Sequence, residues 1–362
     1  MKKTVICLLT LIIILSCTPK PNASPDLISD YKLKFSRNGK LERMKVGLFG
    51  MGYTTDGKYI YAVNGTAMDF LIKSGVPTWK VDNYGEVSGS GNTSGIASTY
   101  STKNIYRYNV ETDKWSINPI QLKPKTFCYA EYVNGEIYVF NGYDRIYFND
   151  RMNRVVNKNV EVFDLYSGEI IYLENNPYPT FYSGSAVWNN KIYVFGGTVK
   201  DGLFSNKLHV YDTYHDEWTR LADMPESKQT RGEIIDGILY VFGGYNGTVS
   251  RNIHAYDIAN DIWDYIGDMP RGVSAHATTR HGDFIWLVGD YYNLCQVAVF
   301  NAKAHDFHII KSNMHGRRHA GAEIIGNKLY VFGGNRESSG SFLSSIQVAD
   351  ISEIEKLLSS TE

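Results

Sequence analysis

The chain has 362 residues, of which 43% are hydrophobic, so it is long and apolar enough to build a substantial core. Its formal net charge is −1 at pH 7, which excludes the general attraction to nucleic acids and anionic lipid surfaces that strongly basic proteins show. It contains 27 tyrosines, and this aromatic content favours a β-rich fold.

The chain begins with an apolar run, Val5 to Leu15, that is too short to span a bilayer as a mature helix. Ser16 and Cys17 follow, and this stretch resembles the lipobox of bacterial lipoproteins, in which the cysteine is acylated. The resemblance implies a signal peptide over residues 1–16, a membrane-anchoring lipid on Cys17 and a tether over residues 17–30. The expected location is the bacterial cell envelope, at the outer membrane or on a periplasmic or surface face. Secretion without a lipid is the alternative.

One strand pattern recurs six times in the remaining chain, and its clearest copy reads KIYVFGG. Each copy alternates in the manner of a half-buried strand and then reaches small residues where the chain turns. A second strand follows each copy and usually ends in an aromatic residue and Asp or Asn, and a further large ring comes shortly after it. The six copies end at Gly65, Gly142, Gly197, Gly244, Asp290 and Gly334.

These residues resemble kelch repeats, in which paired glycines are followed by Tyr-Asp and then by Trp. Gly197, Tyr211-Asp212 and Trp218 match this pattern best, and the repeats recur with a period of about 50 residues. The resemblance covers residues 31–352. It implies an all-β fold, a six-bladed kelch-like β-propeller with four strands in each blade.

The last of the predicted blades lacks one strand. After Gly334, only Ser345 to Ile351 reads as a strand before a polar tail over residues 353–362. At the other end of the domain, Tyr31 to Phe35 alternates as a strand does. We therefore expect this N-terminal strand to complete the sixth blade, which would close the ring and leave no open sheet edge.

Two long loops are predicted on the face where the blades start. Because neighbouring strands alternate in direction, the loop between the second and third strands of a blade lies on that face. This loop is longest in blade one, where it contains Trp79, and in blade two, where it contains Tyr143 and Arg145. Aromatic and arginine side chains on long loops are typical of binding elements. The alternative is a surface insertion whose aromatic side chains fold onto the rim.

Cations, imidazoles and a tyrosine recur at the expected blade starts on the same face. A ring of such groups around a central channel could hold an anion, such as the carboxylate of an acidic sugar or a peptide. The alternative is that they make structural hydrogen bonds inside the fold. The residues are Arg43, Lys125, Tyr182, Arg231, Arg271, His276, Arg318 and His319, with Glu233 close by.

These observations favour a monomeric protein- or glycan-binding module that has no cofactor, no bound metal and no nucleic-acid partner. Its partner is expected on the rim that carries the blade starts and the long loops of blades one and two. An enzyme is the alternative. The chain resembles N-acetylneuraminate epimerase, an exported six-bladed kelch propeller, which implies acid–base opening of a sialic acid ring by Glu233, with Arg231 or Arg318 as a carboxylate clamp.

A second enzyme alternative rests on galactose oxidase, in which a cysteine and a tyrosine at the starts of adjacent kelch blades are cross-linked beside copper. Cys128 and Tyr182 occupy comparable positions, and His276 and His319 would be the imidazole ligands. Without that chemistry, Cys128 and Cys295 are expected to be free thiols, because they fall in blades on opposite sides of the ring.

Overall fold

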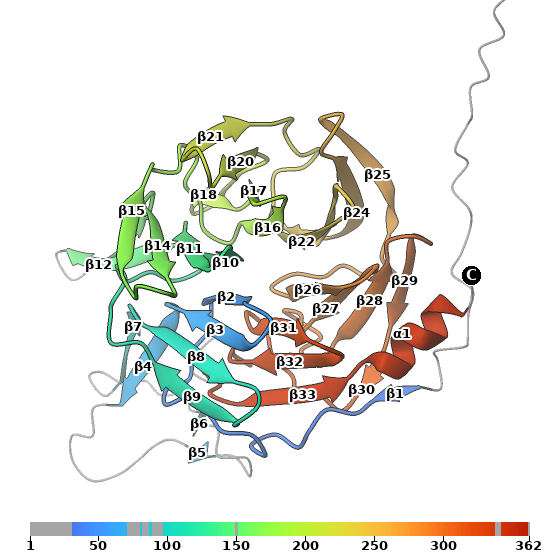
Figure 1. Ribbon diagram of the computed structural model, residues 1–362, viewed down its shortest axis with the longest axis horizontal. Helices are drawn as coiled ribbons and strands as arrows, with labels where there is room; N and C mark the ends of the chain where they lie inside the picture. The colour runs from blue at the N-terminus through green and yellow to red at the C-terminus, as the bar shows by residue number, and fades with distance from the viewer. Residues whose placement is uncertain are drawn as a thin grey trace, which may run out of the picture.

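The computed structural model describes residues 31–70, 80–81, 87–88, 97–148, 151–336 and 342–360. In this part of the chain, six antiparallel sheets stand as a ring around a central channel (Figure 1). This is the all-β, six-bladed propeller that the repeats predict. The innermost strand of every blade borders the channel, and each blade runs outward from there.

The blades follow one another in chain order around the ring. Blade one is formed by β2 (Gly52–Thr55), β3 (Tyr59–Val63), β8 (Ile105–Asn109) and β9 (Lys114–Ile117). Blade two is formed by β10 (Tyr129–Val133), β11 (Glu136–Phe140), β14 (Val160–Asp164) and β15 (Ile170–Leu173). Blade three is formed by β16 (Gly184–Trp188), β17 (Lys191–Phe195), β20 (Leu208–Asp212) and β21 (Glu217–Arg220). Blade four is formed by β22 (Gln229–Ile235), β23 (Ile238–Tyr245), β24 (Val249–Asp257) and β25 (Ile262–Asp268). Blade five is formed by β26 (Ala277–His281), β27 (Phe284–Val288), β28 (Val297–Asn301) and β29 (Asp306–Ile309). Blade six is formed by β31 (Gly321–Ile325), β32 (Lys328–Phe332) and β33 (Ile346–Asp350).

The recurring motif supplies the second strand of each blade. In β17, the four residues from Ile192 to Phe195 are all buried, because the neighbouring blades cover both faces of the strand. The two glycines after it adopt positive φ angles, 65° at Gly196 and 97° at Gly197. A Cβ on Gly197 would lie 2.8 Å from the Thr180 hydroxyl oxygen, so the close approach of this turn to the start of its own blade requires glycine.

The Tyr and Trp rings of the repeat, together with an Asp that lies between them in the sequence, tie blades one, three and four to the segment that precedes them. In blade three, the Tyr211 and Trp218 rings pack 4.8 Å apart. The Trp218 indole nitrogen donates to the backbone oxygen of Glu174 on blade two at 3.3 Å. Asp216 accepts a hydrogen bond from the Glu174 backbone nitrogen at 3.0 Å, so one residue of the preceding blade is held at both its backbone groups. Trp263 makes the same indole bond to Ala222 in the next pair of blades.

The N-terminal segment closes the ring. Phe35 forms an antiparallel bridge with Ala349 of β33, and the Ser36 backbone nitrogen donates to the Val348 oxygen at 2.8 Å. Trp115 of blade one donates its indole N–H to the backbone oxygen of Glu42 at 3.1 Å, which is the bond that Trp218 makes to the preceding blade. The segment therefore occupies the place of a fourth strand in blade six, as predicted.

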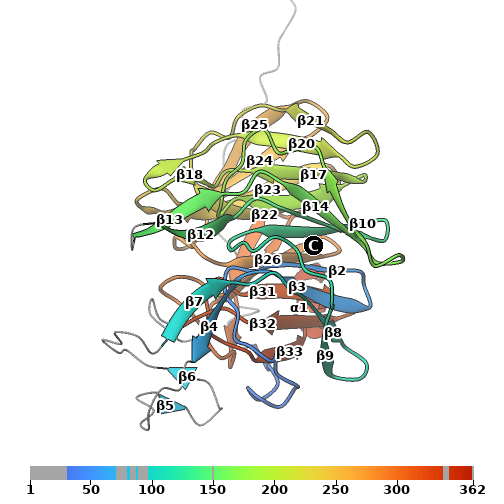
Figure 2. The same cartoon turned by 90° about the vertical axis from the view of Figure 1, so that its left-hand side faces the viewer.

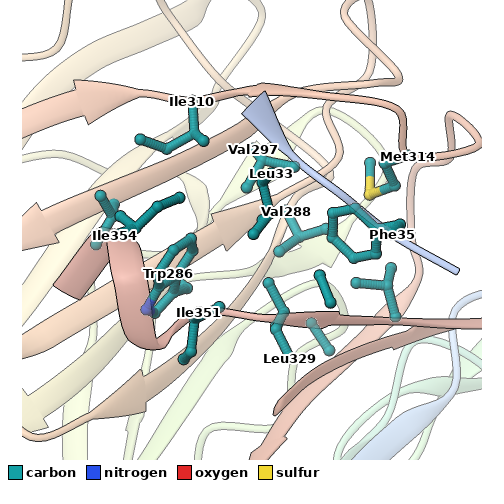
Figure 3. Packing of buried hydrophobic residues seen from close by; sticks show 14 of the residues in the cluster. Leu33, Phe35, Trp286, Val288, Val297, Ile310, Met314, Leu329, Ile351 and Ile354 are labelled. Atoms are coloured by element: carbon teal, nitrogen blue, oxygen red, sulfur yellow. The ribbon is translucent and has the colours of Figure 1, made fainter. Parts of the chain in front are cut away.

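The closing segment is shorter than the sequence suggested. Only its end pairs with β33, whereas β1 (Lys32–Leu33) runs parallel to β30 (Lys311–Ser312), which follows blade five. The reason is the Asn313 side chain, which accepts from the Phe35 backbone nitrogen at 2.7 Å and donates to its oxygen at 3.1 Å. Leu33 and Phe35 are buried in the apolar cluster between blades five and six (Figure 3).

The C-terminal segment is part of the same cluster and is not a free polar tail. It forms α1 (Ser352–Ser359), whose Ile354 and Leu358 side chains are buried against it. Glu355 of α1 accepts a hydrogen bond from the Trp286 indole at 3.0 Å and contacts the His281 ring at 2.7 Å. Within the described chain, no helix has the length and apolar character needed to cross a bilayer.

The long loops lie on the side of the ring where the innermost strands start, as predicted. Figure 2 shows them at the left. Isolated bridges join the blade starts to the first residues of these loops, for example Thr126 to Tyr143 and Phe181 to Thr198. We call this side the loop face and the opposite side the turn face. The loops contain β4 (Thr66–Phe70) with β7 (Ala97–Ser101), β5 (Lys80–Val81) with β6 (Val87–Ser88), β12 (Tyr143–Phe148) with β13 (Arg151–Val156), and β18 (Thr198–Lys200) with β19 (Leu203–Phe204).

Candidate functional site

The mouth of the channel on the loop face is built from left-handed residues at the blade starts. Phe127, Tyr182, Ala275 and His319 all have φ between 51° and 57°. Their backbones link the blades, since the His319 nitrogen donates to the Ala275 oxygen at 2.8 Å. Such φ values are strained for these residue types and turn their side chains toward one another. The rings of Phe127 and Tyr182 lie 3.8 Å apart, and those of Phe127 and His319 lie 5.1 Å apart.

Beside this mouth, a cavity of about 290 Å³ opens on the loop face, and residues of blades three, four, five and six line it. We call it the tyrosine depression. Three of its tyrosines remain accessible, with exposed fractions of 38% for Tyr245, 39% for Tyr291 and 74% for Tyr292. The lining residues are Tyr182, Gln229, Tyr245, Val249, Ser274, Ala275, Tyr291, Tyr292 and His319.

Arg318 holds one wall of the tyrosine depression in place. Its guanidinium carbon lies 4.0 Å from the centre of the Tyr291 ring, and its Nη1 donates to the Tyr291 backbone oxygen at 3.3 Å. Only 6% of Arg318 is exposed. The residue predicted as an anion-binding cation therefore positions a tyrosine through a cation–π contact.

A narrow neck of about 30 Å³ joins the tyrosine depression to the channel, and Tyr182, His276, His319 and Arg231 line it. This volume holds roughly one water molecule. His276 is 2% exposed, and among the described residues neither of its ring nitrogens has a hydrogen-bond partner. Burial and the nearby Arg231 lower the pKa of His276 to about 3, so its ring is neutral at physiological pH.

The channel itself contains a polar cavity of about 380 Å³. Glu131, Glu233 and Glu323 line it together with the guanidinium groups of Arg231 and Arg280. Desolvation raises the pKa of Glu131 to about 8 and that of Glu233 to about 7, and the Glu233 carboxyl adds to the shift of Glu131. Burial and the other two glutamates also raise the pKa of Glu323. The structure thus brings the predicted Arg231 and Glu233 together, but inside the channel.

Three predicted blade-start cations lie elsewhere. Lys125 is completely buried and forms an ion pair with Glu161, which is also completely buried. Arg43 donates to the Ser344 hydroxyl at 3.5 Å, and Gly50 stands at the start of blade one instead. Arg271 donates from Nε to the Gln296 side chain at 2.8 Å, beside blade five. The prediction of a cation ring at the mouth is therefore wrong for these residues, because the kelch fold uses them for internal contacts.

Of the predicted loop residues of blades one and two, the structure describes the side chain of Tyr143. Tyr143 is 2% exposed, packs 5.0 Å from the Phe181 ring and lies under the Arg154 guanidinium, so it supports the β12–β13 hairpin and is not an accessible anchor. Arg145 lies in β12, but its side chain is outside the described residues. Trp79 and Cys17 are also outside them.

The geometry does not support the cross-link expected from a galactose-oxidase-like site. The Cys128 thiol is fully buried and points to the backbone oxygen of Val63 on blade one at 3.7 Å, whereas Tyr182 belongs to the mouth of the channel. Across the described residues, no group of three His, Cys, Asp or Glu side chains is arranged to hold a metal ion. Cys128 and Cys295 are free thiols, as expected.

The accessible tyrosines and two of the channel glutamates were not predicted from the sequence, although the repeat marks both sets. Tyr245 directly follows Gly244, and Tyr291 directly follows Asp290, which is the place of Tyr143 in its own blade. Glu131 and Glu323 pair with Tyr138 and Tyr330, as Glu233 pairs with Tyr240. Aligning the six copies residue by residue would have found all of these positions.

Comparison with known proteins agrees with the repeats and the ring. The family model described as the KLHDC2/KLHL20/DRC7 Kelch-repeats domain matches residues 85–290, more than half of the chain, and a Kelch motif matches residues 316–348. The chain belongs to the kelch-repeat family. Kelch propellers are typically protein-binding modules.

Individual relatives of this kelch propeller are distant. Beta-scruin of Limulus polyphemus is 24% identical over 163 residues, which cover 44% of this chain and 17% of the relative. Kelch-like protein 38 of Rattus norvegicus is 28% identical over 156 residues, covering 42% of this chain and 26% of the relative. Kelch domain-containing protein 3 of Mus musculus is 24% identical over 161 residues, covering 39% and 40%. The chain matches well under two thirds of the length of each.

Proposed function

We propose that this kelch propeller is a binding module whose partner is a protein that docks on the tyrosine depression of the loop face. The observation that carries the proposal is the set of accessible tyrosines, Tyr245, Tyr291 and Tyr292, around one cavity. Tyrosine supplies a large contact area and a hydroxyl group while fixing few torsions, so it anchors protein partners at a small entropic cost. The expected partner inserts a side chain or a short loop into the depression.

The rigidity of the surroundings supports this proposal. Arg318 fixes Tyr291 from behind, and the Phe204 ring packs against Tyr245 at 5.9 Å. Preorganised anchors lose less freedom on binding, which leaves more of the interaction energy for affinity. The hairpins of blades one to three rise on the same face and extend the surface available to a partner.

The test starts from peptides selected from a random library on the immobilised chain. We expect their affinity to fall at least about ten-fold, or 1.4 kcal/mol, in Tyr291→Ala and Tyr245→Ala, since both changes remove an anchor. Tyr214→Ala is the matched control, because Tyr214 is 89% exposed but lies in the turn between β20 and β21. Equal losses in all three variants would refute docking at the depression. If no peptide were enriched and glycans bound selectively, the partner would be a glycan and not a protein.

We also propose that the module is exported to the bacterial cell envelope and anchored by a lipid on Cys17. The support is the apolar run that ends at Ser16 and Cys17. Two acyl chains bury many methylene groups at about 0.8 kcal/mol each, which suffices for stable attachment. In bacterial cells fed an alkyne-tagged fatty acid, the wild type and Cys295→Ser are expected to carry the label in the membrane fraction, and Cys17→Ser to lose it. Equal labelling of Cys17→Ser would rule out this anchor.

The sialic acid epimerase remains the second candidate, since Glu233 and Arg231 do line one cavity. Such chemistry would take place in the channel, which the neck separates from the tyrosine depression. Anomer exchange of N-acetylneuraminate, followed by NMR, distinguishes the two functions. A binding module leaves the exchange rate at its value in buffer, whereas an acceleration that Glu233→Gln abolishes would establish the enzyme.

A further inference from the structure

The channel glutamates form an ordered set. Glu131, Glu233 and Glu323 occupy the same position of the repeat, as their pairing with the tyrosine of the second strand shows. They belong to blades two, four and six, so they stand at one level of the channel on alternate blades. Blades one, three and five carry Thr54, Ala186 and Thr279 at this position. The channel therefore has three carboxyl groups spaced around one ring.

Each carboxyl group has a hydroxyl partner on a neighbouring blade. The Ser185 hydroxyl donates to Glu131 at 2.6 Å. The Thr278 and Thr279 hydroxyls act on Glu233 and Glu323 to lower the pKa of these carboxyls against the effect of burial, and the Thr278 hydroxyl donates to the Gly232 backbone oxygen at 3.4 Å. A carboxyl group has room for several further hydrogen bonds, so these contacts leave acceptor capacity for a molecule in the cavity. The cavity is thus lined by groups that bind hydroxyl and ammonium donors.

Aromatic faces and two guanidinium groups complete the lining. Arg231 stacks 4.5 Å from the centre of the Tyr129 ring and 5.8 Å from that of Tyr53. The Tyr53 hydroxyl reaches across the channel and donates to the Thr278 backbone oxygen at 3.2 Å. Arg280 is the second cation of the lining. When the three carboxyl groups are ionised, the two guanidinium groups compensate all but one negative charge.

We propose that this channel cavity is a second binding site, which takes a small polyhydroxylated molecule carrying a single ammonium group. One ammonium group balances the one uncompensated carboxylate, and the hydroxyl groups of the ligand pair with the remaining acceptors. The cavity volume of about 380 Å³ lies within the range of small-molecule sites. Tyr53 and Tyr129 offer ring faces against which a carbon skeleton packs.

His276 is an independent indication of a ligand. It is buried at the neck, its ring is neutral, and its nitrogens have no hydrogen-bond partner among the described residues. A buried polar group without a partner is costly, and a donor from a bound molecule would remove that cost. The neck shares Tyr129 and Arg231 with the channel cavity, so a group of the ligand that extends from the cavity into the neck would face His276.

The ligand would enter from the turn face. The far end of the cavity is lined by His281 and Gly282, and the His281 side chain is 37% exposed. On the loop face, the neck admits only about one water molecule. The proposed site is therefore separate from the tyrosine depression, and neither proposal depends on the other.

Protonation of the glutamates gives this site a pH dependence of known sign. Because the pKa values of Glu131 and Glu233 are raised to about 8 and about 7, the empty cavity holds protons at neutral pH that an ammonium group would displace. Binding should then tighten as the pH rises from 6 to 8.5. Glu323 acts in the same direction, because burial and the other two glutamates raise its pKa as well. Arg231 stays protonated, and burial raises the pKa of Tyr53 and Tyr129. His281 also lines the cavity end, where it contacts Glu355, so the His281→Gln variant serves as a control.

The test uses three six-carbon polyols that differ in one group: glucamine with an amine, sorbitol with a hydroxyl and gluconate with a carboxylate. Calorimetry on the full chain is expected to show glucamine binding at least about ten-fold more tightly than sorbitol, and gluconate no more tightly than sorbitol. The preference for glucamine over sorbitol should grow between pH 6 and pH 8.5, and it should grow in the same way in the His281→Gln variant. Preferential binding of gluconate, or no binding of any of the three, would overturn the proposal.

Matched variants locate the site. Glu131→Gln, Glu233→Gln and Glu323→Gln each keep the shape of the side chain and remove the one uncompensated charge, so each is expected to abolish the preference for glucamine over sorbitol. Glu217→Gln is the control, because Glu217 is exposed on β21. Peptide binding at the tyrosine depression should be unchanged in all four variants, which separates this proposal from the function proposed above. Retention of the preference in all three channel variants would contradict the site.

Discussion

Phe35→Ala is expected to lower the free energy of unfolding by about 3–5 kcal/mol, which is the cost of emptying a large buried aromatic position. Phe35 is only 4% exposed and packs in the cluster that joins blades five and six to α1 (Figure 3). It also forms the bridge to Ala349 that closes the ring. Urea unfolding followed by tryptophan fluorescence measures the change, because Trp286 belongs to the same cluster.

The neighbouring Lys34 provides the control for this prediction. Its side chain is exposed on the other side of the same segment, so Lys34→Ala should change the stability by less than about 0.5 kcal/mol. Deletion of residues 31–36 should go further, because it uncovers the edge of β33. We expect oligomers in size-exclusion chromatography. A monomeric deletion variant that unfolds like the wild type would show that the N-terminal segment does not close the propeller.

Glu161→Gln is expected to destabilise the propeller by about 3–5 kcal/mol, because it leaves the ammonium group of Lys125 buried without a counter-charge. Both side chains of this pair are completely buried. Glu161 also accepts a hydrogen bond from the Lys123 backbone nitrogen at 2.8 Å, so it fixes the approach to blade two. Thermal and chemical unfolding of the purified variant measure the loss.

An exposed ion pair gives the comparison for this second prediction. Lys303 pairs with Asp283, but 61% of the lysine side chain is exposed, so Lys303→Met should cost less than about 1 kcal/mol. Lys125→Met should be destabilising as well, since it leaves the Glu161 carboxylate alone. If Glu161→Gln were as mild as Lys303→Met, the buried pair would contribute little to the stability of the propeller.

The fold could be predicted because its causes repeat along the chain. The second-strand motif, the glycines and the Tyr and Trp rings each make the same contacts in several blades, as Trp218 and Trp263 do with the preceding blade. Even the absence of a fourth strand from the C-terminal part of blade six could be predicted from the sequence. The register of the closing segment could not, because it depends on a single side chain, Asn313, whose hydrogen bonds to Phe35 have no sequence signature.

The site was harder to predict, because residue type does not reveal which way a side chain points. Lys125 and Arg317 both stand two residues before the left-handed residue of their blade, and both are completely buried. Arg317 donates to the backbone oxygens of Gly333 and Ser345 at 3.2 and 3.1 Å. The alternative interpretation of the sequence, that such cations make structural contacts inside the fold, is therefore correct for Lys125 and Arg317.

The tyrosines show that loop length decides accessibility. Tyr143 and Tyr291 occupy the same place in the repeat, but Tyr143 begins the long β12–β13 hairpin, whose Arg154 covers its ring. Tyr291 lies in the short connection from β27 to β28 and stays partly exposed. The sequence favours the longer loops of blades one and two as binding elements. In this propeller, the shorter loops of blades four and five leave their tyrosines open.

The proposed protein partner binds the loop face at the tyrosine depression. Hydrogen–deuterium exchange of the chain, with and without a selected peptide, tests it most directly. We expect protection of the segments around Tyr245, Ala275 and Tyr291, and no change in the turns that carry Tyr166 and Tyr214. Protection confined to those turns, with the depression unaffected, would contradict it.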